Sequence, residues 1–196
     1  MRSVLVLAPP FGPRSAETAT AGSARDAGVK GKGLGVGFFL ALLAVAGCTQ
    51  PEPPEFVSKE HRFRVRFGSP PAVSAKAKST VYVVEAADGA LTVTITELPT
   101  PDDDPVERVP LYLASARDDL IRAARGTQTA DASATLAGKY PGRAFAARFT
   151  EPQPGAMRAR IYLVGKRLYQ AMAIGTEDYA NSAAATAFLE SFRLTE

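Results

Sequence analysis

Short stretches in which apolar and polar residues alternate follow one another after residue 60. A period of two is typical of a β-strand that buries one face. The pattern predicts strands over residues 61–67, 80–86, 90–98, 127–137, 143–150, 157–164 and 167–174. Between neighbouring strands, Asp88-Gly89 predicts a type I′ hairpin turn and Gly165-Lys166 a type II′ turn. The chain is therefore expected to form antiparallel hairpins.

The alternation also assigns residues to faces. In the first strand, three apolar residues alternate with three arginines: Phe63, Val65 and Phe67 on one face, Arg62, Arg64 and Arg66 on the other. In the third strand, Leu91, Val93 and Ile95 share one face. Because a buried face excludes charged side chains, we expect the two apolar sets to point into the core.

Two segments have helical rather than strand periodicity, over residues 105–126 and 182–192. The first has an apolar stripe: Val109, Leu113, Ala116, Leu120 and Ala124. Gly126 is expected to end this helix, and Ser182 to cap the start of the second. The second helix is expected to bury Phe188, Leu189 and Phe192. An α+β fold follows, with an antiparallel sheet packed by a central helix and a short C-terminal helix.

Three segments carry a resemblance to a known family: Gly138–Arg143, Arg158–Tyr169 and Phe188–Phe192. They resemble small bacterial secreted or lipoprotein domains of unassigned function, whose architecture is similar to the PsbP and Mog1-like α/β/α sandwich. The resemblance covers most of residues 56–196, which we expect to form one globular domain. It rests on turn and core residues and brings no catalytic residue with it.

An apolar run over residues 34–46 follows Lys30 and Lys32 and ends at Cys48. It is shorter than the roughly 20 residues that a membrane-spanning helix needs. The run resembles a bacterial lipoprotein signal, with Val45-Ala46-Gly47-Cys48 as the lipobox. The resemblance implies that residues 30–47 are a signal peptide and that Cys48 carries the lipid, including palmitate. The alternative is a transmembrane anchor in which Cys48 has no special role.

The segments on either side of this signal are not expected to belong to the fold. Residues 1–29 are rich in Pro, Ala, Ser, Thr and Gly. They are interpreted as a misassigned start, with translation beginning near Val29, or as a disordered leader or a second weak signal. Residues 48–55 contain closely spaced prolines, which predict an extended tether of about 20 Å. The alternative for this segment is an arm that caps the domain.

Removal of the signal changes the charge balance. Five of the 23 basic residues and two of the 20 acidic residues precede Cys48, so 18 of each sign remain. A neutral mature chain gives no reason to expect nucleic acid as a partner. Cys48 is the only cysteine, so no disulfide can form within one chain.

Few residues suggest chemistry. His61 is the only histidine, which excludes a zinc site built from several histidines. It lies beside Ser58 and Glu60, and we expect an exposed histidine at a strand edge rather than a catalytic one. The acidic group at residues 102–104 and Glu107 is a candidate calcium site, but the N-terminus of a helix also attracts acids. We therefore expect no catalytic residue, no metal ligand and no cofactor.

A binding face is the remaining candidate site. It comprises five arginines on two predicted strands: Arg62, Arg64, Arg66, Arg158 and Arg160. If the strands are neighbours, these side chains could bind carboxylates, phosphate headgroups or a partner protein. The alternative is an ordinary solvated face, paired with Glu85, Glu97 or Glu151. Tyr162 and Tyr169 would either add contact area there or pack in the core.

These expectations favour a membrane-anchored lipoprotein of the bacterial cell envelope. Its domain would be a non-enzymatic binding or accessory module with an envelope protein as partner. The alternative is an envelope receptor for a small ligand or ion, which uses the arginine face or a pocket between sheet and helix. A hydrolase is a more distant third. Thr49 after the cysteine resembles an outer-membrane address, while the choice between the two membranes stays open.

Overall fold

The computed structural model describes residues 54–98 and 108–195, which belong to one compact unit. The predicted signal, Cys48, most of the tether and the acidic group at residues 102–107 lie outside the described residues.

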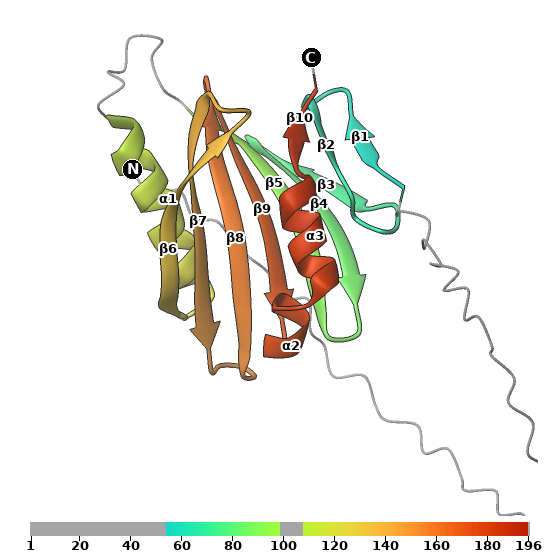
Figure 1. Cartoon of the computed structure of the whole chain (residues 1–196), viewed down its shortest axis with the longest axis vertical. Coiled ribbons are helices and arrows are strands. Elements are labelled where there is room, and N and C mark those ends of the chain that lie inside the picture. The colour runs from blue at the N-terminus through green and yellow to red at the C-terminus, as the bar shows by residue number, and fades with distance from the viewer. Residues whose placement is uncertain (1–53, 99–107, 196) are drawn as a thin grey trace, which may run out of the picture. The chain divides into compact units, whose positions relative to one another are not determined.

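A seven-stranded sheet forms the centre of the domain (Figure 1). Its strands are β3 (Ala72–Lys76), β4 (Ser79–Ala86), β5 (Gly89–Glu97), β6 (Thr127–Leu136), β7 (Tyr140–Phe149), β8 (Gly155–Val164) and β9 (Arg167–Gly175). Their order is β3-β4-β5-β9-β8-β7-β6, and every neighbouring pair is antiparallel. The chain leaves the sheet after β5, returns at the far edge with β6, and then meanders back until β9 pairs with β5.

A small sheet and three helices complete the fold of the described residues. The small sheet contains β1 (Phe56–Ser58), β2 (Phe63–Val65) and β10 (Arg193–Leu194), with β2 in the middle. The helices are α1 (Val109–Ala123), α2 (Glu177–Ala180) and α3 (Ala183–Ser191). The fold is α+β, as the periodicity predicts.

The two faces of the large sheet are covered by different elements. On one face, Leu113 and Leu120 of α1 pack against β7 and β8. On the opposite face, Phe188 and Leu189 of α3 pack together with the small sheet against β5 and β9. Figure 1 shows α3 in front of the β9 and β5 region. The predicted burial of the apolar sets on both helices, on β2 and on β5 is confirmed.

Phe192 joins the two sheets through aromatic contacts. Its ring lies 5.7 Å from Phe63 of β2, 5.9 Å from Tyr162 of β8 and 5.8 Å from Tyr169 of β9, measured between centroids. Phe192 is only 1% exposed. This aromatic cluster holds the end of α3 between the small and the large sheet.

One end of each main helix has an identifiable cap. Ser182 accepts a hydrogen bond from the backbone N–H of Ala185 at 3.1 Å, so its predicted capping role is confirmed. At the C-terminus of α1, the N–H of Gly126 donates to the carbonyl of Ile121 at 2.9 Å. The residue with positive φ is Arg125, at 50°, rather than the glycine. α1 thus ends at Ala123, slightly before the predicted stop at Gly126, and Arg125 rather than the glycine takes the left-handed conformation.

The hairpin between β4 and β5 is confirmed, but its predicted turn is wrong by one residue. Ala86 pairs with Gly89, so the turn residues are Ala87 and Asp88. Gly89 instead begins β5, where an added Cβ would lie 2.3 Å from Cδ1 of Tyr179. Close packing therefore requires this glycine. The predicted Gly165-Lys166 turn is at the expected position, because Val164 pairs with Arg167. Gly165 has the positive φ that the turn requires, 57°.

Several boundaries also differ from the sequence pattern. Pro141-Gly142 lies inside β7 rather than before it, and Pro141 pairs with Thr135. β2 begins only at Phe63, because Arg62 has a φ of 51° that breaks the strand. The pattern also missed the short elements β1, β3, β10 and α2.

Candidate functional site

The arginines of the first predicted strand belong to the small sheet. Arg64, on β2, forms an exposed ion pair with Glu55 at 3.5 Å. The backbone N–H of Arg66 donates to the hydroxyl of Ser191 in α3 at 2.9 Å. Arg62 is exposed in the turn that precedes β2. All three therefore lie on or next to β2, the middle strand of the small sheet.

The other two arginines lie on β8, in the large sheet, and face α3. Nη1 of Arg158 donates to the hydroxyl of Thr186 at 2.8 Å. Nη2 of Arg160 lies 3.6 Å from a carboxylate oxygen of Glu190. Both arginines are half-buried, and both side chains contact the same helix.

The five arginines do not form the single face that the sequence suggested. β2 and β8 belong to different sheets, so the condition that the strands are neighbours is not met. The arginines on β8 instead join others that sequence reasoning missed. The missed ones are Arg193 in β10 and Arg148 in β7.

A hollow of about 490 Å³ lies between the end of α3, β10 and the turn after β6. Its walls include Arg160, Arg193 and Glu190, with Tyr162 and Leu136 beneath. Arg193 donates from Nη1 to the carbonyls of Glu190 at 2.6 Å and Phe192 at 2.7 Å. Arg193 and Arg160 thus line the same hollow at one end of α3.

A second hollow, of about 210 Å³, lies further along β8 towards α2. It is lined by Arg148, Arg158, Glu177 and Asn181 together with small residues of β7 and β8. Arg148 and Glu177 form an ion pair across it. Since Arg158 and Arg160 are two residues apart on one strand, the two hollows are neighbours on one face of the sheet.

The strip beside the hollows consists of small residues. In the sheet register Ala144 pairs with Arg160, and Ala146 pairs with Arg158. Alanines of β6 continue the same face beyond β7. These residues make up an alanine floor: Ala130, Ala132, Ala134, Ala144 and Ala146. We call this floor, with the two hollows beside it, the α3 groove.

The α3 groove has an excess of positive charge. Four arginines line it, whereas two glutamates, Glu177 and Glu190, balance Arg148 and Arg160. Arg158 and Arg193 hydrogen bond to a hydroxyl and to carbonyls, which are neutral acceptors. Within the described part of the chain, these two guanidinium groups have no carboxylate within ion-pair distance. The groove can therefore attract an anionic group.

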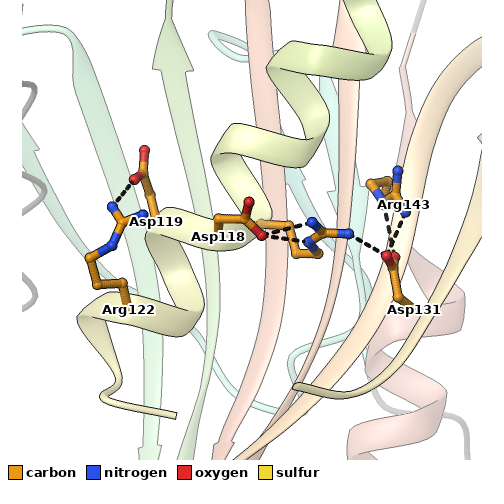
Figure 2. Close-up of polar contacts among 6 residues, drawn as sticks. Asp118, Asp119, Arg122, Asp131 and Arg143 are labelled. Carbon is orange, nitrogen blue, oxygen red and sulfur yellow. Dashed lines mark hydrogen bonds and ion pairs between the residues drawn. The ribbon is translucent and has the colours of Figure 1, made fainter. Parts of the chain in front are cut away.

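A separate ion-pair network lies on the opposite face of the sheet, where Arg117 of α1 reaches β6 (Figure 2). Asp131 of β6 accepts hydrogen bonds from Nε of Arg143 at 2.9 Å and from Arg117 of α1. Its side chain is 13% exposed. The hydrogen bonds from Arg143, more than those from Arg117, hold the pKa of Asp131 below its ordinary value, and partial burial opposes them. The network connects α1 to β6 and β7. Because its charged groups are paired with one another, we do not interpret it as a binding site.

His61 has a different environment from the one expected. Its side chain is 12% exposed, so the prediction of an exposed histidine is wrong. The ring lies 6.0 Å from that of Tyr82. The hydroxyl of Ser58 forms a hydrogen bond with the hydroxyl of Tyr82 at 3.0 Å. It also accepts a hydrogen bond from the backbone N–H of His61, so Ser58 contacts the backbone of the histidine and not its imidazole ring. The histidine is thus packed as an aromatic side chain.

The two tyrosines near the last hairpin are core residues. Tyr162 is 4% exposed and Tyr169 is 2% exposed. Tyr169 also donates from its hydroxyl to the carbonyl of His61 at 2.9 Å, which links β9 to the small sheet.

Two further observations concern the described residues alone. Among them, no group of three or more His, Cys, Asp or Glu side chains is placed to hold a metal ion. None of the helices in residues 54–98 and 108–195 has the length and hydropathy to cross a membrane.

Comparison with known proteins gives a structural match without a sequence match. No protein-family model and no curated protein sequence matches the chain. The solution structure of cyanobacterial PsbP (CyanoP) from Synechocystis sp. PCC 6803 is similar, with a TM-score of 0.55 and 12% identity. The match covers 78% of this chain and 98% of CyanoP. The domain therefore has a PsbP-like fold, and at this identity the likeness concerns the fold alone.

Two other solved structures show weaker likeness. One, from Bacteroides thetaiotaomicron VPI-5482, has a TM-score of 0.43 and 9% identity and covers 74% of this chain and 49% of its own. The other, a Pseudomonas aeruginosa protein of unknown function, has a TM-score of 0.37 and 8% identity. The match covers 63% of this chain and 83% of the Pseudomonas chain.

Proposed function

We propose that the protein is a lipoprotein of the bacterial cell envelope, held to a membrane through a lipid on Cys48. Its PsbP-like domain acts as a non-enzymatic binding or accessory module for another envelope protein. The main support for the anchor is the sequence from Lys30 to Cys48. It has a charged start, a short apolar run and a lipobox-like end.

The start of the folded domain supports this arrangement. β1 begins at Phe56, eight residues after Cys48. Glu55 forms an ion pair with Arg64, so the domain begins immediately after the proline-rich segment. A lipid on Cys48 would therefore be separated from the domain by a short proline-rich spacer.

The α3 groove supports the binding role. It provides a positively charged surface on a rigid sheet, and its arginines have the donor geometry that suits carboxylates. A fixed, charged groove of this kind is suited to recognition of a partner that carries the opposite charge.

Substitution of Cys48 by serine tests the anchor. Wild-type protein is expected to take up labelled palmitate and to remain with membranes after washes with high salt and carbonate. Cys48→Ser should take up no label and should no longer be firmly held. Thr49→Ser is the matched control and should behave as wild type. Retention of the Cys48→Ser variant in the membrane, with no label on the wild type, would show that the anchor is not a lipid.

A small-ligand receptor is the second candidate, favoured by the hollow beside Arg160 and Arg193. Its volume of about 490 Å³ is within the range of small-molecule sites. A thermal-shift screen of anionic metabolites would test this function, because a ligand that binds the folded state raises Tm. The shift should disappear in an Arg160→Gln/Arg193→Gln variant, and a screen without any stabilising compound would contradict this candidate.

A further inference from the structure

We infer that the α3 groove binds an extended segment of a partner protein with acidic side chains at alternate positions. The inference rests on the proposed binding role and specifies the chemistry of the partner. Four features carry it: the length of the groove, the spacing of its arginines, its alanine floor and its excess of positive charge.

The length of the groove fits a peptide rather than a compact molecule. Along β8, the two hollows extend from Ala156 to Tyr162. Six residue steps at about 3.3 Å each give roughly 20 Å. A small anion would fill one hollow only, whereas about six residues of extended chain would occupy both.

The spacing of the arginines matches the period of an extended chain. Arg158 and Arg160 are two residues apart on one face of β8, so their Cα atoms are about 7 Å apart. Side chains at alternate positions of an extended peptide have the same separation. A segment that lies on the alanine floor, parallel to β8, can thus present one carboxylate to Arg158 and the next to Arg160 and Arg193, which line one hollow.

The alanine floor gives such a segment access. The side chains of Ala144 and Ala146 end at Cβ, so the backbone of a peptide can approach the sheet closely. Ala132 is exposed at the outer side of the floor, and Ala144 and Ala146 are half-buried. The covering helix α3 packs on β9 and on β2 of the small sheet.

The charges of the groove determine the sign of the partner. Of the guanidinium groups, those of Arg158 and Arg193 bond to neutral oxygens. Arginine has five N–H donors, and the hydrogen bond from Arg158 to Thr186 involves Nη1. The remaining donors can bind a carboxylate in a bidentate arrangement.

Peptide binding to the full wild-type chain, purified in a mild non-ionic detergent, tests the inference. The probe is a fluorescein-labelled peptide of four Glu-Thr repeats, and binding is followed by fluorescence anisotropy. A second peptide has the same composition in two Glu-Glu-Thr-Thr repeats, so that no two of its glutamates are two positions apart. The alternating peptide should bind at least about fivefold more tightly, because only its carboxylates match the spacing of the arginines. Its binding should weaken as salt is added.

Two matched double variants locate the binding. Arg158→Gln/Arg193→Gln should weaken binding of the alternating peptide by about tenfold. Arg122→Gln/Arg125→Gln removes the same charge from side chains that are each 76% exposed and should change binding by less than about twofold. Ala132→Glu, at an exposed floor position, should also weaken binding about tenfold through repulsion. Its neutral control is Ala132→Gln. These floor variants keep the test decisive if the first double variant unfolds.

Several outcomes would overturn the inference: no binding of the alternating peptide, equal binding of the two peptides, or equal losses in the two double variants. Competition by glutarate at the concentration of the peptide would indicate a site for small carboxylates instead. Competition by phosphatidylglycerol vesicles would indicate a lipid surface. The protein is tested in detergent whether or not Cys48 is lipidated. Absence of peptide binding would therefore not contradict the lipid anchor, and absence of palmitate labelling would not contradict peptide binding by the α3 groove.

Discussion

Arg158 of β8 donates a hydrogen bond to Thr186 of α3, with 2.8 Å between Nη1 and Oγ1. The bond connects the sheet to the helix that forms one wall of the groove. It also fixes the guanidinium in place without neutralising its charge. One contact thereby contributes to the stability of the fold and to the positive charge of the candidate site.

Thr186→Val should lower the stability of the domain. Valine keeps the shape of threonine but leaves an N–H of the half-buried Arg158 without its acceptor. The expected loss is about 1–2 kcal/mol, or a fall in Tm of about 3–6 °C. Thermal unfolding followed by circular dichroism measures it. Thr135→Val, at an exposed position of β6, is the control, and equal changes in Tm for the two variants would contradict the role of the bond.

Asp131→Asn should destabilise the domain in a pH-dependent way. The hydrogen bonds from Arg143 lower the pKa of Asp131 in the folded state. The carboxylate therefore contributes its full stabilisation above its unfolded pKa of about 3.9 and loses it as pH falls through the lower folded value. At pH 7 we expect Tm to fall by about 4 °C, and the difference from wild type should shrink below about pH 4.

The control for Asp131 is Asp119→Asn in α1. Asp119 is 55% exposed and pairs with Arg122, which is 76% exposed (Figure 2). Such surface pairs contribute little, so Tm should stay within about 1 °C of wild type. A difference for Asp131→Asn that persists unchanged to pH 2 would exclude the ion-pair explanation.

Phe192→Leu should weaken the junction between the two sheets. The change removes ring contacts with Phe63, Tyr162 and Tyr169 and leaves space that the rigid core fills only in part. The expected cost is about 2 kcal/mol, measured by urea unfolding with an unchanged m-value. Leu111→Ala, at a position 69% exposed, should cost less than about 0.5 kcal/mol. Similar midpoints for the two variants would show that the aromatic cluster is not a centre of stability.

Arg125→Gly should stabilise the end of α1. Arg125 has a φ of 50°, a conformation that glycine adopts without the steric cost of a Cβ. Arg125→Ala removes the same exposed ion pair with Glu151 but keeps the Cβ. The glycine variant should therefore be about 1 kcal/mol more stable than the alanine variant. Equal Tm values for the two would mean that the conformation carries no strain.

Sequence patterns predicted the parts of the fold that depend on local periodicity. Phe63 and Val65 alternate with arginines, so their burial follows from the period of a strand. The apolar stripe of α1 follows in the same way from the period of a helix. The short strands β1 and β10 were missed because two or three residues give no periodic signal, and their pairing with β2 joins segments far apart in the chain.

The candidate site was only partly predictable for the same reason. Sequence reasoning found Arg158 and Arg160, since both lie on one strand. It placed them with the arginines of β2, because strand order is not encoded in local alternation. Arg193 and Arg148 join the groove through tertiary packing. The contacts of Asp131 were missed for the same reason, because its partners Arg117 and Arg143 come from α1 and β7.

The mass of the N-terminal tryptic peptide of the mature protein tests the lipid anchor most directly. Cleavage before Cys48 and digestion with trypsin should give residues 48–59, which end at Lys59. Mass spectrometry of protein extracted from membranes should find this peptide only with the added mass of a diacylglyceryl thioether on Cys48. Cys48→Ser should not yield the lipidated peptide. An unmodified Cys48 within a longer peptide that extends back towards Lys32 would contradict the account.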